Sequence, residues 1–154
     1  MADFEKPRPA STVVLVKPLE TGFQIYLLKR SEQSGFFPGT YVFPGGTVSS
    51  EDRDADLWLK HCDLDLRGVE KRLGGTIPAT EMLVYGVAAI RETFEEGGVL
   101  LASRPKESDS GLAAICATRR VKRLSKGWFK EWAVSGDWHL HLSRLAPWTH
   151  WITP

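Results

Sequence analysis

The sequence has few of the residues that mark secreted, metal-stapled or membrane-spanning chains. Only two of its 154 residues are cysteines, Cys62 and Cys116, and they form no CxxC pair. A disulfide framework and a cysteine zinc site are therefore not expected. No apolar run approaches the roughly 20 residues that a membrane helix needs, and the opening MADFEKPRPA has no apolar core of a secretory signal. These absences favour a cytoplasmic protein with reduced thiols.

Net charge is also nearly absent, at +1, so nothing in the overall charge predicts binding to nucleic acid or to membranes. A length of 154 residues, with 42% hydrophobic and 25% charged residues, predicts one globular domain over residues 1–154. The charge is uneven, however. Ser49–Glu70 carries seven acids against three bases, and Arg119–Lys130 carries six bases and no acid. The basic stretch either attracts an anionic ligand or is a solvated helix face.

The first third of the chain has the pattern of short strands. Two β-branched and aromatic runs, Val13–Val16 and Phe23–Leu28, flank turn residues at Pro18–Gly22 and predict a β-hairpin. A further short strand is expected at Tyr41–Phe43, with Pro44-Gly45-Gly46 as a turn that ends it sharply.

Helical patterns dominate the middle of the chain. Residues 49–79 are acidic with a short apolar pattern of their own, which indicates an inserted element of one or two helices. Thr80–Glu96 has apolar residues at near-helical spacing and predicts a helix that Gly97-Gly98 ends, with a strand at Val99–Ala102. Another helix is expected at Leu112–Leu124, and a last strand near Trp148–Thr153.

Three glutamates crowd into the end of the predicted helix Thr80–Glu96. Glu92, Glu95 and Glu96 are three and four residues apart, so a helix places them on one face, about 5–6 Å apart at Cβ. Like charges at this spacing repel, and the negative end of the helix dipole adds to the cost. A hard divalent cation such as Mg²⁺ would relieve it. The alternative is a solvated acidic helix end.

The segment that holds these glutamates, Arg91-Glu92-Thr93-Phe94-Glu95-Glu96-Gly97-Gly98-Val99, matches the pattern R-E-U-x-E-E-x-G-U, in which U is bulky and apolar. It resembles the second half of the Nudix box, the signature of the Nudix hydrolases, with Thr93 in place of an apolar residue. The first half of that box, G-x5-E, is similar to Gly45 followed by Glu51.

The two halves of the box are unusually far apart. Between Glu51 and Arg91 lie 39 residues where the family usually has seven, so the box resembles one split by the insertion at about 49–79. The counterpart of the family's first glutamate is then Glu51, or Asp52 or Glu81 if one of them lies closer in space.

A split box, together with the residues upstream of it, resembles the coenzyme A and acyl-coenzyme A diphosphatase branch of the family. Arg30-Ser31, Gly39 and Phe43-Pro44-Gly45-Gly46 fall at the spacing of that branch's upstream signature. Gly35 stands where the signature has a second arginine. The alternative substrates are ADP-ribose, NADH or another nucleotide, and a nucleotide-binding module without catalysis is also open.

The resemblance implies an α/β fold, an α/β/α sandwich around a mixed sheet, and hydrolysis of a nucleoside diphosphate linked to another group with Mg²⁺ or Mn²⁺. Glu95 and Glu96 would be metal ligands, Glu92 a ligand or the general base, and Arg91 a partner that holds a glutamate in place. Gly45 and Gly46 would let backbone approach the substrate, or serve as a tight turn. Arg30 would contact a phosphate, or be a surface charge.

The expected strands are fewer than the family fold needs. Either the C-terminal part of the fold is missing or a partner subunit completes the sheet, so a homodimer stays open. The four histidines have no metal-ligand spacing and are expected to be surface or packing residues. Five of the six tryptophans lie in residues 127–153, where core packing is favoured over stacking on an adenine.

Overall fold

A long helix forms the centre of the molecule. The computed structural model describes residues 7–35, 37–104 and 127–150. Helix α3 (Ala79–Glu92) continues without a break into one turn of π-helix, η2 (Thr93–Gly97), and ends at Gly98 in the left-handed conformation, with φ of 74°. The predicted helix and its glycine stop are therefore confirmed. No helix in these three ranges is long and apolar enough to cross a membrane.

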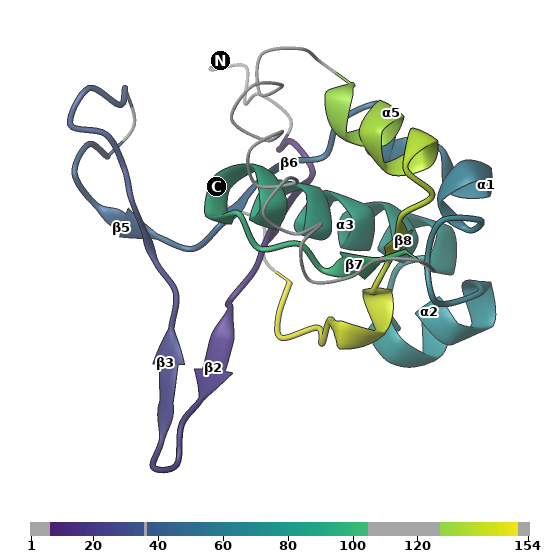
Figure 1. The fold of residues 1–154 in the computed structure, drawn as a ribbon, viewed down its shortest axis with the longest axis horizontal. Helices are drawn as coiled ribbons and strands as arrows, with labels where there is room; N and C mark the ends of the chain where they lie inside the picture. Colours follow the sequence, from purple (N-terminus) through teal and green to yellow (C-terminus); the bar gives the residue numbers. More distant parts are fainter. Residues whose placement is uncertain (1–6, 36, 105–126, 151–154) are drawn as a thin grey trace, which may run out of the picture.

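The inserted segment packs against α3 (Figure 1). It contains a short 3₁₀ turn, η1 (Glu51–Arg53), and two helices, α1 (Ala55–Trp58) and α2 (Leu66–Leu73), which confirms the helical prediction. Each helix begins at an aspartate whose carboxylate accepts a hydrogen bond from a backbone N–H three residues on. Such N-caps satisfy donors that the first turn of a helix leaves unpaired.

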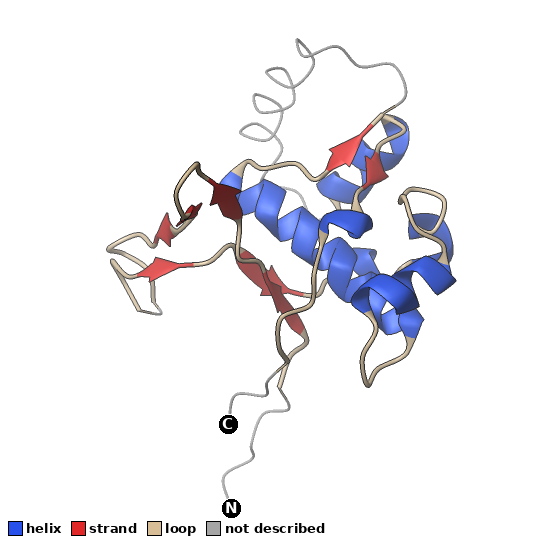
Figure 2. Cartoon of the chain, turned by 90° about the horizontal axis from the view of Figure 1, so that it is seen from below, coloured by secondary structure: helices blue, strands red, loops and turns tan. Residues whose placement is uncertain are grey.

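The strands described are short and pair in four antiparallel ladders (Figure 2). The pairs are β1 (Ala10–Thr12) with β6 (Gly45–Thr47), β2 (Val16–Pro18) with β3 (Phe23–Ile25), β4 (Leu28–Lys29) with β5 (Tyr41–Val42), and β7 (Ala102–Ser103) with β8 (His139–Leu140). The predicted hairpin and the short strand after it are confirmed. Gly45 and Gly46, expected in a turn, are instead strand residues of β6, paired with a strand that the sequence pattern did not indicate.

The core lies between α3, the inserted helices and the C-terminal segment, which contains helix α5 (Trp128–Ser135), β8 and the 3₁₀ turn η3 (Leu142–Arg144). Trp128, Phe129 and Trp138 are buried here against Trp58 and Phe94, so the tryptophans of this region mainly pack, as predicted. Trp148 differs, with 94% of its surface exposed.

Several expectations fall partly or wholly outside the described residues. The predicted helix Leu112–Leu124, Cys116 and the basic stretch up to Lys126 lie there. The strand expected near Trp148–Thr153 is absent from residues 148–150, which are irregular, and its remaining residues lie outside the described ranges.

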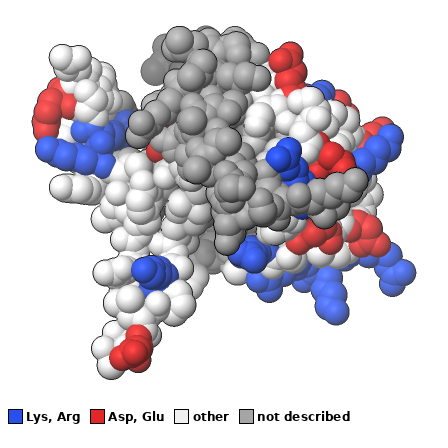
Figure 3. Space-filling view, viewed as in Figure 1, with Lys and Arg blue, Asp and Glu red and all other residues white. Residues whose placement is uncertain are grey.

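The hairpin β2–β3 projects from the body as an arm. Its side chains include several exposed apolar residues, so the arm is largely white in Figure 3. The most exposed of these in the two strands are Val16, at 56%, and Phe23, at 64%. The arm's base reaches η2, where the Tyr26 ring lies against Gly97.

Candidate functional site

Arg91 is the centre of the candidate site. Its side chain is buried at the C-terminal end of α3, with 7% of the residue exposed. Nε and Nη2 donate to the two carboxylate oxygens of Asp52, each at 2.9 Å, and Asp52 is completely buried. The second oxygen of Asp52 also accepts from the backbone N–H of Ser49, at 2.7 Å. This bidentate pair ties the start of the inserted segment to the end of α3.

The remaining donors of Arg91 hold the glutamates and the strand β6. Nη1 donates to Glu92 Oε1 at 2.7 Å and to Glu95 Oε2 at 3.0 Å, and Nη2 donates to the Thr47 carbonyl at 3.0 Å. A guanidinium has five N–H donors, and these bonds use all five. One arginine therefore fixes the rotamers of two glutamates relative to β6.

Strand β6 approaches the glutamates through its glycines. The Gly45 N–H donates to Glu96 Oε2 at 3.0 Å. A Cβ on Gly46 would lie 2.5 Å from Glu92 Oε1, and one on Gly45 would lie 2.8 Å from the Thr12 Cα of the paired strand. Since real contacts are longer than this, only glycine permits β6 to lie against both β1 and Glu92.

The electrostatics of the cluster leave it short of positive charge. Burial raises the pKa of Glu92 and of Glu95 above the ordinary value, and Arg91 lowers them by less than burial and the neighbouring carboxylates raise them. Burial would lower the pKa of Arg91, but its bonds to Asp52 and the charges of the glutamates raise it above its ordinary value. The cluster thus holds four carboxylates, those of Asp52 and the three glutamates, and one guanidinium, a formal charge of −3 with all of them ionised.

The structure brings most of the residues expected in the site together: Arg91, Glu92, Glu95, Glu96, Gly45 and Gly46. Asp52, not Glu51, contacts Arg91, while the Glu51 carbonyl accepts from the Trp58 indole. Glu81 is ten residues before Arg91 on the same helix, which is about 15 Å along its axis. The sequence has no local signal that tells whether Glu51 or Asp52 contacts Arg91, because the burial of Asp52 follows from the turn η1.

Arg30 lies on a different element from the glutamates. It follows β4 on the β4–β5 hairpin, where its backbone N–H donates to the Thr40 carbonyl at 2.9 Å.

The donor set suits a hard divalent cation. Glu92, Glu95 and Glu96 each have one oxygen bonded to Arg91 or Gly45, and the other accepts no hydrogen bond within the described part of the chain. Carboxylate oxygens are the ligands that Mg²⁺ and Mn²⁺ prefer. Mg²⁺ usually takes a few carboxylates together with phosphate oxygens, so the three glutamates would share a bound cation with such oxygens.

At the end of α3 a buried arginine holds two of three clustered glutamates, the arrangement expected of a Nudix box, and comparisons with known proteins identify the family. The family model described as the NUDT19 Nudix domain matches residues 5–154. The chain therefore belongs to the Nudix hydrolases, in the NUDT19 Nudix domain family.

Individual relatives are distant. The chain is 29% identical over 188 residues to the acyl-coenzyme A diphosphatase NUDT19 of Homo sapiens, covering 99% of this chain and 48% of that one. It is 28% identical to the protein of the same name from Xenopus laevis, covering 86% and 42%. The chain thus spans less than half the length of these curated relatives.

Among solved structures, a NUDIX hydrolase from Alicyclobacillus acidocaldarius is similar, with a TM-score of 0.70 and 19% identity over 98% of this chain and 64% of that one. This likeness confirms the predicted Nudix-like α/β fold.

Proposed function

We propose that this chain, with Mg²⁺ or Mn²⁺, hydrolyses coenzyme A or an acyl-coenzyme A to 3′,5′-ADP and the corresponding phosphopantetheine. Water adds at one phosphorus of the diphosphate and the bond from that phosphorus to the bridging oxygen breaks. The observation that supports a diphosphatase is the set of three glutamates at the end of α3, two of them held by the buried Arg91 and the third by the Gly45 N–H. Relatives named acyl-coenzyme A diphosphatases favour coenzyme A thioesters as the substrate class.

In this proposal the three glutamates have different roles. Glu95 and Glu96 hold the metal, and Glu92 is either a third ligand or the base that takes a proton from the attacking water. When bound, the metal would neutralise the diphosphate oxygens and lower the pKa of a bound water. Arg91 acts indirectly, because all its donors bind protein acceptors and none is left for substrate.

Gly45 and Gly46 admit the backbone of β6 to the cluster. The Gly45 N–H is bonded to Glu96, so a positioning role for Gly45 is better supported than direct binding of substrate. Arg30, on the β4–β5 hairpin, is proposed to contact the 3′-phosphate of coenzyme A. For the Arg119–Lys126 stretch, which lies outside the described residues, the same role rests on charge alone.

A substrate panel tests the proposal. Coenzyme A, an acyl-coenzyme A, ADP-ribose, NADH and a diadenosine polyphosphate are each incubated with the chain, with Mg²⁺, with Mn²⁺ and with neither. Metal-dependent release of 3′,5′-ADP from the two coenzyme A compounds is the expected result. Turnover of ADP-ribose or NADH alone would refute the substrate class, and binding without turnover of any compound would refute the enzyme.

The contribution of Arg30 is tested by comparing coenzyme A with dephospho-coenzyme A, which lacks the 3′-phosphate. A charge-assisted bond to phosphate is worth about 1.5–3 kcal/mol, or roughly ten- to a hundredfold in kcat/KM. Arg30→Ala should shrink the preference for coenzyme A, and the matched change Arg53→Ala, on η1, should not. An unchanged preference in Arg30→Ala would exclude Arg30 from the phosphate site.

Three further predictions concern the organisation of the protein. We infer that residues 1–154 behave as a single Nudix-like domain, that the location is cytoplasmic, and that two copies form a homodimer. The exposed apolar side chains of the β2–β3 arm support an association of copies, because large exposed apolar patches mark contact surfaces. Light scattering of the wild type and of Phe23→Lys measures the mass, and a monomer in both would exclude the homodimer.

A further inference from the structure

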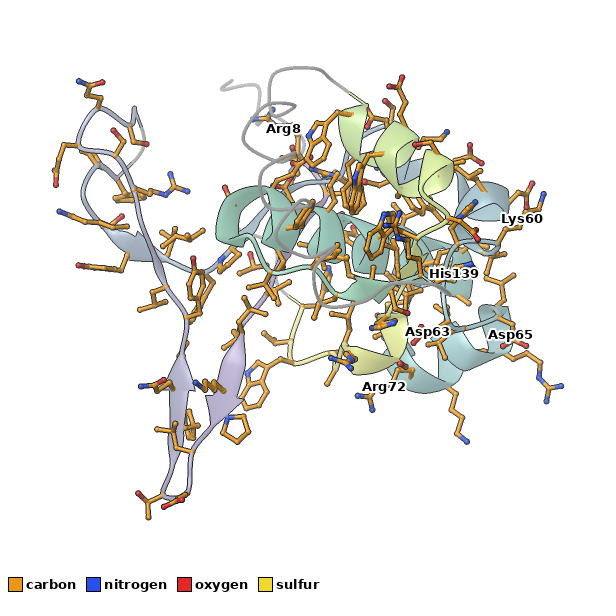
Figure 4. The ribbon with its side chains drawn as sticks, in the orientation of Figure 1. Arg8, Lys60, Asp63, Asp65, Arg72 and His139 are labelled. Carbon is orange, nitrogen blue, oxygen red and sulfur yellow. The ribbon has the colours of Figure 1, made fainter. Side chains whose placement is uncertain are left out.

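Two histidines that are far apart in the sequence meet at the junction of the inserted segment and the C-terminal strand. His61 follows α1, and His139 is the first residue of β8. The two rings lie 5.8 Å apart between centroids. Figure 4 shows His139 in the same part of the molecule as Lys60 and Asp63, the residues on either side of the pair His61-Cys62. Histidines expected to act only as surface or packing residues are thus brought together.

Asp137 completes a group of three potential metal ligands. One ligand atom from each of His61, Asp137 and His139 lies within 4.8 Å of the other two, and this is the only such group in the described ranges. We propose that these three residues bind a transition-metal ion of the Zn²⁺ class, at a site separate from the glutamate cluster.

The distance between His139 and Asp137 is that of two ligands of one metal ion or, with a protonated imidazole, of a loose ion pair. Nε2 of His139 lies 3.6 Å from Oδ1 of Asp137, which is too long for a hydrogen bond. Two ligands of a tetrahedral ion with bonds of about 2.0–2.1 Å lie roughly 3.4 Å apart. The observed separation is therefore close to the edge of a zinc tetrahedron.

The orientation of His61 is fixed as it is in many metal sites. Its Nδ1 lies 3.2 Å from the Trp138 carbonyl. A hydrogen bond from Nδ1–H to this carbonyl places the lone pair on Nε2, the atom that would bind the ion. Metal-binding histidines almost always donate their other ring N–H to a carbonyl or carboxylate in this way.

The ligand atoms of His61, Asp137 and His139 determine which metal ion the site prefers. Imidazole nitrogens favour Zn²⁺, Cu²⁺ or Ni²⁺, whereas Mg²⁺ prefers oxygen ligands. Three protein ligands leave a fourth position for water or another group. The backbone around the site is already joined, since the Leu140 N–H donates to the His61 carbonyl at 2.8 Å and the Asp63 N–H donates to the Leu140 carbonyl at 3.0 Å. A bound ion would therefore fasten the inserted segment to β8.

Zinc binding to the full 154-residue chain, measured by calorimetry in excess Mg²⁺, tests the proposal. His139→Asn and Asp137→Asn remove ligands from exposed or half-buried positions, and Asn tolerates the positive φ of Asp137, 52°. Both variants should bind Zn²⁺ at least about tenfold more weakly, since even residues behind the ligands contribute that much. His141→Asn is the matched control, because His141 lies two residues from His139 and pairs with the Ser103 hydroxyl instead.

Co²⁺ gives an independent readout. The wild type and His141→Asn should show the intense visible bands of a four-coordinate nitrogen and oxygen site, and Asp137→Asn and His139→Asn should not. The proposal is overturned if the wild type binds no Zn²⁺, if the two ligand variants bind it as tightly as the wild type, or if only Glu92→Gln and Glu95→Gln weaken binding.

Discussion

Replacing Asp52 with asparagine tests whether the buried pair with Arg91 is what organises the glutamate cluster. The side chain keeps its size, but one carboxylate oxygen becomes an NH₂ donor that faces the guanidinium. The change removes the negative partner of a buried cation and one acceptor for Arg91, and if Oδ2 is the oxygen replaced it also removes the acceptor for the Ser49 N–H. Breaking a buried pair by removing one partner costs about 3–5 kcal/mol.

The free energy of unfolding, from urea titration, should therefore fall by about 3–5 kcal/mol in Asp52→Asn. For a chain of this size each kcal/mol lowers the melting temperature by about 2–4 °C, so the expected drop is roughly 6–20 °C. Glu51→Gln is the matched control, one residue away and without a bond to Arg91. It should change stability by no more than about 0.5 kcal/mol.

Activity gives a second measure in the same variant. If Asp52 orients Arg91, which in turn holds Glu92 and Glu95, then kcat should fall in Asp52→Asn at temperatures where the protein stays folded. The reasoning is refuted if Asp52→Asn loses less than about 1 kcal/mol, or if Glu51→Gln is as damaging, because the first acid of the split box would then be Glu51.

Three other variants follow from the same cluster. Glu95→Gln should lower kcat at least about a hundredfold in steady-state assays, because it removes a metal ligand. The far-ultraviolet circular dichroism should stay unchanged, because no core contact is removed. Activity within a few-fold of wild type would exclude Glu95 as a ligand. Thr93→Val should raise the free energy of unfolding, measured by urea titration, by up to about 1–3 kcal/mol. The reason is that the buried Thr93 hydroxyl has no hydrogen-bond partner within the described residues. A less stable variant would indicate a partner for that hydroxyl. The pKa values of Glu92 and Glu95 are raised above 4.5 on folding, so the folded protein holds more protons than the unfolded chain just above that pH. Metal-free protein should therefore lose stability as the pH rises from about 4.5 through the raised values, and the double change to glutamine should flatten this slope; equal slopes in urea titrations across that range would refute the sign.

The sequence predicted the parts of the site whose signal is local. The glutamates and the helix that carries them are read from a 3.6-residue apolar period and an acidic last turn. The glycines were recognised, but their geometry was not, because Gly45 and Gly46 next to a proline are typical of a turn. Their partner strand, Ala10–Thr12, has weak β propensity and lies 35 residues away along the chain.

The choice of Asp52 over Glu51 depends on which face of η1 is buried, which adjacent acids do not reveal. The meeting of His61 with Asp137 and His139 was equally invisible, since it arises from the contact of two distant segments. Pairings between distant segments have no periodic or spacing signal in a single sequence.

The pair of Asp52 and Arg91 also explains how a signature can tolerate a long interruption. Asp52 stands near the start of the extra segment and Arg91 near the end of the helix that follows it, so their bond acts as a clasp across the loop between them. The entropy of closing a loop grows slowly, by about 0.6 kcal/mol for each doubling of its length. Once Asp52 and Arg91 are paired, a change in the length of the loop between them adds little to the free energy of closing that loop. Residues 59–65, between α1 and α2, are not a place for such a change, because their backbone bonds to β8; the exposed residues 74–76, between α2 and α3, are where the insertion best tolerates a change of length.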